Sequence, residues 1–100
     1  MDPIFLEIIL IVPDLMASGI ESRDEIEDPL NEALERAGIG EVTGGGSGMG
    51  KSNIDVDFNI GVSLAEAVSF LKSILREANA PRSTVIIKHR PQRVEYPVWE

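Results

Sequence analysis

The chain has 100 residues, of which 43% are hydrophobic and 26% charged, as in a soluble globular protein with room for one two-layer core. It contains no cysteine, which excludes disulfides, thiolate metal sites and cysteine nucleophiles. Its formal net charge is −8, and residues 1–50 hold eleven acidic side chains against two basic ones. Such a chain repels phosphate backbones and anionic lipids, so we expect no binding to nucleic acid or membranes. The absence of cysteine leaves the compartment open, and a cytoplasmic location is the default expectation.

The first element that the sequence predicts is a buried strand from Ile4 to Val12. This run is nearly continuously apolar, rich in β-branched side chains, interrupted only by Glu7, and it ends at Pro13. A run of this kind is typical of a strand covered on both faces. It is too short to span a bilayer, and no basic segment precedes it as in a secretory signal. We therefore place this strand at the centre of a sheet.

A helix is predicted next, and its start can be placed at two positions. Asp28 can cap the backbone amides of a helix whose first residue is Pro29. Alternatively, residues 22–25 have the pattern of a capping box, which begins the helix earlier and leaves Pro29 inside it. In both cases apolar residues keep helical spacing up to Ala37, and Gly38 ends the helix.

The middle of the chain predicts a β-hairpin. Residues 41–43 favour a short strand, and the glycine-rich segment 44–50 is expected to be the loop that follows it. From Ile54 to Val62, apolar residues alternate with polar residues or glycine, which is the clearest strand pattern in the chain. The apolar set of this strand, from Ile54 to Ile60, is expected to face the helices.

The C-terminal part predicts a second helix, a further strand and an extended tail. Ser63 and Glu66 form a capping box at the start of a helix with regular apolar spacing up to Ala78. Residues 83–88 favour a strand, and residues 90–100 form a tail with two prolines that can pair as an additional edge strand. Tyr96 and Trp99 are expected to anchor this tail or to grip a partner.

The predicted order of strand, helix, strand, strand, helix, strand covers one α+β domain, residues 1–100. It is typical of the ferredoxin-like βαββαβ sandwich, a four-stranded antiparallel sheet with the first and third strands central and both helices on one face. The segments Gly40–Gly46 and Ile54–Asp57, and Leu75–Ala78 before Ala80 and Pro81, resemble small uncharacterised bacterial proteins of this architecture. The resemblance implies the fold and transfers no activity.

The segment from Gly45 to Ser52 (GGSGMGKS) matches the phosphate-binding pattern GxxxxGK[ST]. That pattern holds nucleotide phosphates where a helix begins directly after it, because the phosphates sit at the helix N-terminus. A strand is predicted here instead. We therefore interpret the segment as a hairpin turn and expect no nucleotide or other cofactor.

The uncovered face of the predicted sheet is the main candidate for function. Its central strands would combine carboxylates with large apolar side chains. Three hypotheses remain: a solvated face whose carboxylates prevent strand pairing, a surface for a protein partner or a second copy, and a metal or acid–base site built from Glu7, Asp55 and Asp57. The candidate interaction surface consists of Phe5, Glu7, Ile9, Ile11, Asp55, Asp57, Asn59, Tyr96 and Trp99.

The sequence favours a non-enzymatic protein-interaction module with an acidic surface, such as an immunity or inhibitor protein that binds a basic partner. The alternative is a small-ligand-binding regulatory domain that acts as a homodimer. His89 is the only histidine, and no nucleophile with a base and no spaced metal ligands are visible, so we expect no catalytic or metal residues. The basic residues Arg82, Lys88, Arg90 and Arg93 suggest RNA binding, which we disfavour because the third strand offers carboxylates where RNA-binding sheets carry stacking aromatics.

Overall fold

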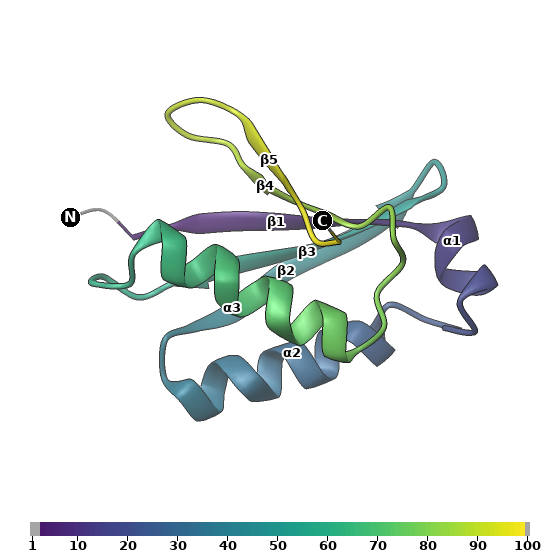
Figure 1. Ribbon diagram of the computed structural model, residues 1–100, viewed down its shortest axis with the longest axis horizontal. Helices are drawn as coiled ribbons and strands as arrows, with labels where there is room; N and C mark the ends of the chain where they lie inside the picture. Colours follow the sequence, from purple (N-terminus) through teal and green to yellow (C-terminus); the bar gives the residue numbers. More distant parts are fainter. Residues whose placement is uncertain (1–2, 100) are drawn as a thin grey trace.

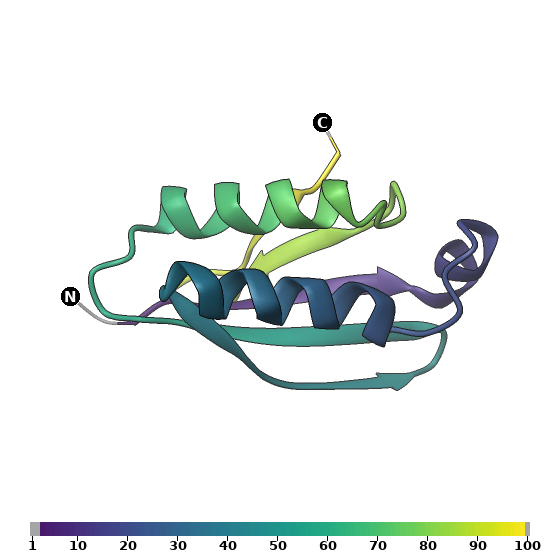
Figure 2. The same cartoon turned by 90° about the horizontal axis from the view of Figure 1, so that it is seen from below.

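The computed structural model describes residues 3–99 and forms, in this range, a five-stranded sheet with three helices. The sheet has the strand order β2-β3-β1-β4-β5, and every neighbouring pair is antiparallel. Helices α2 and α3 lie side by side on one face of it (Figures 1 and 2). In chain order the elements are β1 (Phe5–Ile11), α1 (Val12–Ala17), α2 (Asp24–Ala37), β2 (Gly40–Gly48), β3 (Lys51–Phe58), α3 (Leu64–Glu77), β4 (Val85–Lys88) and β5 (Val94–Pro97).

The predicted α+β class is confirmed, and the first and third strands are neighbours inside the sheet as expected. The sheet has five strands and not the four of the predicted sandwich, because the C-terminal tail pairs as the additional edge strand that its sequence allowed. β5 pairs with β4 along its whole length, and Val98 directly after it is fully buried. The sequence also did not predict α1, the short helix that follows β1.

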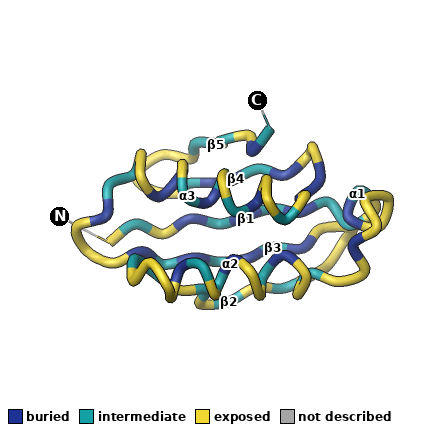
Figure 3. The backbone as a smooth tube through the Cα atoms, turned by 60° about the horizontal axis from the view of Figure 1, so that its bottom comes forward, coloured by how far each residue is buried: buried dark blue, intermediate teal, exposed yellow. Residues whose placement is uncertain are grey.

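Strand β1 is buried on one face only, contrary to the prediction of a strand covered on both sides. Leu6, Ile8 and Leu10 point toward the helices and have no exposed surface. The residues between them are intermediate in exposure, and the tube in Figure 3 alternates accordingly along β1 and β3. The reason is that both long helices lie on the same side of the sheet, so the other side of β1 has no covering layer from the described chain.

The glycine-rich segment is a strand and not a loop. Residues 44–48 belong to β2 and pair with β3 in continuous register, after one register shift between Val42 and Gly44. Only Met49 and Gly50 form the turn, with φ angles of 53° and 79° that suit a tight two-residue hairpin. The turn is held in place by a hydrogen bond from the backbone N–H of Val12 to the carbonyl of Gly50 (2.8 Å).

Strand β3 begins three residues before the predicted start and ends earlier than predicted. It runs from Lys51 to Phe58, so Ile60 lies outside it and is 70% exposed instead of facing the helices. Val62 is buried but also lies beyond the strand. The alternation of apolar and polar residues continues past Phe58 in the sequence. This pattern therefore does not mark the residue at which backbone pairing stops.

The helix ends follow the local signals in the sequence. α2 uses the earlier of the two predicted starts, and the Glu25 carboxylate accepts the backbone N–H of Ser22 (3.1 Å), as in half of a capping box. α3 begins as predicted, because the Ser63 hydroxyl accepts the N–H of Glu66 (3.1 Å). No helix in residues 3–99 is long and apolar enough to cross a membrane.

Candidate functional site

The uncovered face of the sheet brings six of the predicted site residues together. Alternate residues of β1 and β3 point to this face, and the strand register places them side by side across the two central strands. The pairs are Phe5 with Asp57, Glu7 with Asp55, Ile9 with Asn53 and Ile11 with Lys51.

This face is divided lengthwise into an apolar and a polar part. Over β1 and β4 it is mainly apolar, since Ile9 lies opposite Val85 and Phe5 is 39% exposed. Over β3 it is polar: the Asn53 side chain donates a hydrogen bond to the Asp55 carboxylate (3.0 Å), and Asp57 lies one step further along the strand. A partner on this face therefore meets an apolar strip beside a row of carboxylates.

Glu7 is the one carboxylate inside the apolar part, and His89 accounts for its position. The Glu7 Oε1 and His89 Nε2 atoms are 2.8 Å apart, and the imidazole is stacked on Phe5 with ring centroids 6.3 Å apart. These contacts bring the end of β4 onto the start of β1. His89 thus has specific partners, which the sequence did not reveal because 82 residues separate it from Glu7.

The other three predicted residues do not belong to the uncovered face. Asn59 follows the end of β3, and its side chain donates to the carbonyl of Gly38 (2.9 Å), so it ties the β3 end to the end of α2. Tyr96 and Trp99 both pack against the core. Trp99 donates from Nε1 to the Ala80 carbonyl (2.8 Å), so of the two roles offered for these aromatics, anchoring of the tail is the one observed.

The structure has neither the geometry of a phosphate-binding loop at residues 45–52 nor, within residues 3–99, that of a metal site on the sheet face. Lys51 and Ser52 belong to β3, so a strand and not a helix follows the GxxxxGK[ST] match, as predicted. Lys51 is exposed, and Ser52 is buried and shares a hydrogen bond with Ser47 (2.7 Å). Within residues 3–99 no three His, Cys, Asp or Glu side chains are arranged to hold a metal ion, so Glu7 and its neighbours on β3 do not converge on one point.

A groove at one end of the sheet was not predicted. It has a volume of about 1240 Å³ and lies between the start of β1, the start of α3 and the segment after β4. Lys88 and Arg90 line it, and neither forms an ion pair with another residue in the described range. The predicted basic cluster is therefore split, because Arg93 pairs with Glu95 (2.8 Å) and Arg82 lies over the Trp99 ring (4.1 Å).

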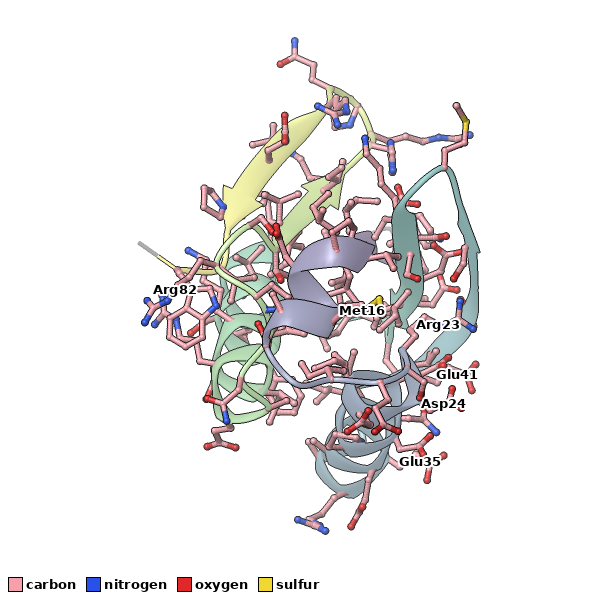
Figure 4. The ribbon with its side chains drawn as sticks, turned by 90° about the vertical axis from the view of Figure 1, so that its right-hand side faces the viewer. Met16, Arg23, Asp24, Glu35, Glu41 and Arg82 are labelled. Carbon is pink, nitrogen blue, oxygen red and sulfur yellow. The ribbon has the colours of Figure 1, made fainter. Side chains whose placement is uncertain are left out.

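The acidic front half of the chain is concentrated on α2. Asp24, Asp28 and Glu35 recur at helical spacing around Asn31, so they share one side of the helix. Asn31 fixes that side beside β2, because its Oδ1 accepts the N–H of Val42 (3.3 Å). In Figure 4, which looks along α2, Asp24 in its first turn and Glu35 in its last turn lie on the same side of the helix as Glu41 of β2. An acidic surface therefore flanks β2, some distance from the residues predicted as the site.

These features define an α+β protein with an open, acidic and partly apolar sheet face. No family model and no curated protein matches the chain. Its fold is similar to that of a phage SAM lyase solved in complex with S-methyl-5'-thioadenosine, with a TM-score of 0.55 and 12% sequence identity. The match covers 98% of this chain and 90% of the lyase. At that identity the likeness concerns the fold alone.

Proposed function

We propose that the protein is a non-enzymatic interaction module that binds a basic protein partner on the uncovered face of its sheet. The observation that supports this function is the composition of that face: an apolar strip with Phe5 39% exposed beside the carboxylates of Asp55 and Asp57. Exposed apolar patches rimmed by polar groups commonly mark protein contacts. Carboxylates beside them favour a basic partner and speed its approach. An immunity or inhibitor protein is one form that such a module takes.

The two central strands differ in a way that favours a partner over a solvated face. An antiparallel sheet with one wet face normally alternates between apolar inside and polar outside. β3 follows this rule with Asn53, Asp55 and Asp57, whereas β1 places Ile9 and Ile11 on the same open side. Burying such side chains contributes about 25 cal/mol for each Å² of apolar surface removed from water. A partner that covers the open side of β1 would therefore gain binding free energy by removing these apolar side chains from water.

The test compares two double variants with the same change in net charge. Asp55→Asn with Asp57→Asn removes two carboxylates from the open face, and Glu32→Gln with Glu77→Gln removes two from the exposed surface between α2 and α3. Each protein is used to capture partners from a lysate of its source cells at low salt. We expect a basic protein that the second variant retains and the first loses. Equal retention by both variants, or an acidic partner, would contradict the proposal.

A second candidate is the binding of a small ligand in the groove beside Phe5. The stacked Phe5 and His89 rings place an aromatic surface at its wall, and Leu64 adds an aliphatic side chain. Concave sites with few polar groups are where small ligands bind. The lyase of similar fold was solved with a nucleoside thioether, a ligand with a planar base. This candidate corresponds to the alternative function, a small-ligand-binding regulatory domain that acts as a homodimer.

The two candidates are separated by adding S-methyl-5'-thioadenosine to the purified protein. Binding in the groove raises the melting temperature, Phe5→Ala removes the rise, and Ile9→Ala on the open face leaves it intact. Sedimentation with and without the compound tests the homodimer. No saturable shift up to millimolar concentration would rule this ligand out.

A further inference from the structure

Strand β2 is an edge of the sheet that the chain leaves open. Its inner side pairs with β3, and within residues 3–99 no strand pairs with its outer side. It is nine residues long, contains no proline or lysine, and has Glu41 as its one charged residue. Proteins normally protect such edges with short strands, prolines, lysines or bulges, because exposed backbone groups recruit other strands. One such bulge is present in β2, at the register shift between Val42 and Gly44, so the residues left without protection are Gly44–Gly48.

The opposite edge of the same sheet is protected in ways that residues Gly44–Gly48 of β2 are not. β5 has four residues and ends at Pro97, and its Glu95 pairs with Arg93, the residue just before the strand. A short strand with a proline and paired charges is a poor template for another strand. The two edge strands therefore differ, and of the two it is β2 whose outward backbone groups are accessible to another strand.

The free backbone groups of β2 can be assigned from the ladder. On β3, the N–H of Phe58 points to β1, where it donates to Ile4, and the N–H of Asn59 points to the β2 side, where it donates to Ile39. Alternation along β3 then directs the backbone of Asp55 and Asn53 toward β2, opposite Gly44 and Gly46. The N–H and C=O of Gly45 and Ser47 therefore face outward. The outward N–H of Val42, further along, is already taken by Asn31.

The charges on both sides of this edge select the occupant. On the helix side lie Asp24, Asp28 and Glu35 of α2, and on the open side lie Asp55 and Asp57 of β3. Arg23 also lies on the helix side, against Gly45, and its charge is compensated by Glu27 (3.4 Å). A strand added to β2 would project its side chains alternately toward these two acidic surfaces. A second copy of this chain would instead bring two acidic α2 helices together, which like-charge repulsion disfavours. Basic side chains are the complement.

We propose that β2 binds an extended, basic segment of a partner protein as an additional strand, by backbone pairing to Gly45 and Ser47. The proposal rests on the proposed function, since it takes a basic partner for granted, and it adds how that partner is held. Backbone hydrogen bonds supply affinity in this mode, and alternate side chains supply specificity.

Ser47 offers a matched pair of variants for the test. Ser47→Pro removes the outward N–H without removing a hydrogen bond to β3, since proline is tolerated on the free side of an edge strand. Ser47→Ala keeps the N–H and loses only the hydroxyl bond to Ser52, which Ser47→Pro also loses. The melting temperatures of the two variants report whether the sheet is intact. The difference between them in binding therefore reports the outward backbone group.

The probe is a nine-residue peptide in which pairs of lysines alternate with pairs of valines, so that lysines lie on both faces of the extended chain. Its C-terminus is amidated, and it is titrated at low salt. We expect equal affinity for the natural protein and Ser47→Ala, and a loss of about tenfold or more for Ser47→Pro. The same peptide N-methylated on its central five amides keeps every charge but cannot pair, and we expect it not to bind. Exchange of the Gly45 and Ser47 amide hydrogens, followed by NMR, should slow when the unmethylated peptide is bound.

The alternatives give different results. Equal binding of the methylated peptide would show attraction to surface charge only, and equal binding to Ser47→Pro and Ser47→Ala would exclude pairing at this edge. A dimer of the protein alone that Ser47→Pro dissociates and Ser47→Ala does not would show that the occupant is a second copy. If Ser47→Pro fails to fold, the methylated peptide and the amide exchange still decide. A basic partner captured equally by both variants would leave the interaction module standing and refute the strand pairing.

Discussion

Two glycines of β2 should respond in opposite directions to the same substitution. A Cβ atom at Gly45 would lie 2.6 Å from the backbone oxygen of Asn53 and 3.4 Å from the guanidinium carbon of Arg23. A Cβ atom at Gly48 would meet nothing within 4 Å. Neither residue has a left-handed φ, so alanine is compatible with the backbone conformation at both. The comparison of the two alanine variants therefore separates the effect of packing on stability from the effect of chain flexibility.

The expected magnitudes follow from these distances. Alanine in place of a freely replaceable glycine stabilises by about 0.4–1 kcal/mol, because the unfolded chain loses conformational freedom. We expect this gain for Gly48→Ala. At Gly45 the overlap with a backbone atom cannot be relieved by a side-chain rotation, and overpacking of this kind costs about 1–3 kcal/mol. Gly45→Ala should therefore be destabilised by up to about 2.6 kcal/mol after the gain is subtracted, and it should be about 1–3 kcal/mol less stable than Gly48→Ala.

Urea unfolding of the two variants and the natural protein measures this difference. For a chain of this size, each kcal/mol corresponds to a change of about 4–8 °C in melting temperature, so calorimetry gives an independent value. If residues 44–48 were a flexible loop, as the sequence suggested, both variants would gain a little stability or stay unchanged. A Gly45→Ala protein as stable as Gly48→Ala would therefore refute the paired strand, and with it the edge on which the strand-pairing proposal rests.

Three further outcomes are expected. Ser63→Ala should lower the unfolding free energy by about 1 kcal/mol, because it removes the hydroxyl that caps α3, while Ser69→Ala on the exposed side of the same helix should not destabilise. Trp99→Phe should cost about 1 kcal/mol through the lost indole hydrogen bond, whereas Tyr96→Phe removes a hydroxyl that bonds to nothing in the described range and should be near neutral. ATP with Mg²⁺ at millimolar concentration should not change the melting temperature; a saturable rise that Lys51→Ala abolishes would contradict the absence of a phosphate loop.

The parts of the fold that the sequence predicted correctly depend on short-range patterns. The α3 start needs only Ser63 and Glu66, three residues apart, and the capping contact forms as the pattern indicates. β3 is read from the alternation of Ile54 to Phe58, since its two faces really do differ in burial. In each case the neighbours that decide the structure lie within one helical turn or one strand of each other.

The glycine-rich strand could not be predicted, because its stability comes from its partner. Glycine has a low intrinsic preference for strands, so residues 44–48 favour a loop by themselves. The ladder to β3 overrides that preference, and the close approach of Gly45 to Asn53 leaves no room for a larger residue. The groove was missed for a similar reason: Phe5, Leu64 and Arg90 are distant in the sequence and meet only through the sheet order.

The predicted site was partly recovered because one face of a strand is fixed by alternation, whereas residues outside strands are not. Glu7 and Asp55 face each other as the two patterns together require, but Asn59 and Trp99 leave the face once β3 ends and the tail turns to the helix side. The remaining error, that β1 is covered on both sides, bears on function. A continuous apolar strand is explained inside this chain only for Leu6, Ile8 and Leu10; the apolar residues between them have no covering layer from residues 3–99. The sequence of β1 therefore has the composition of a strand that is covered on both faces, although the helices cover only one face of the sheet. A bound partner would supply the second covering layer.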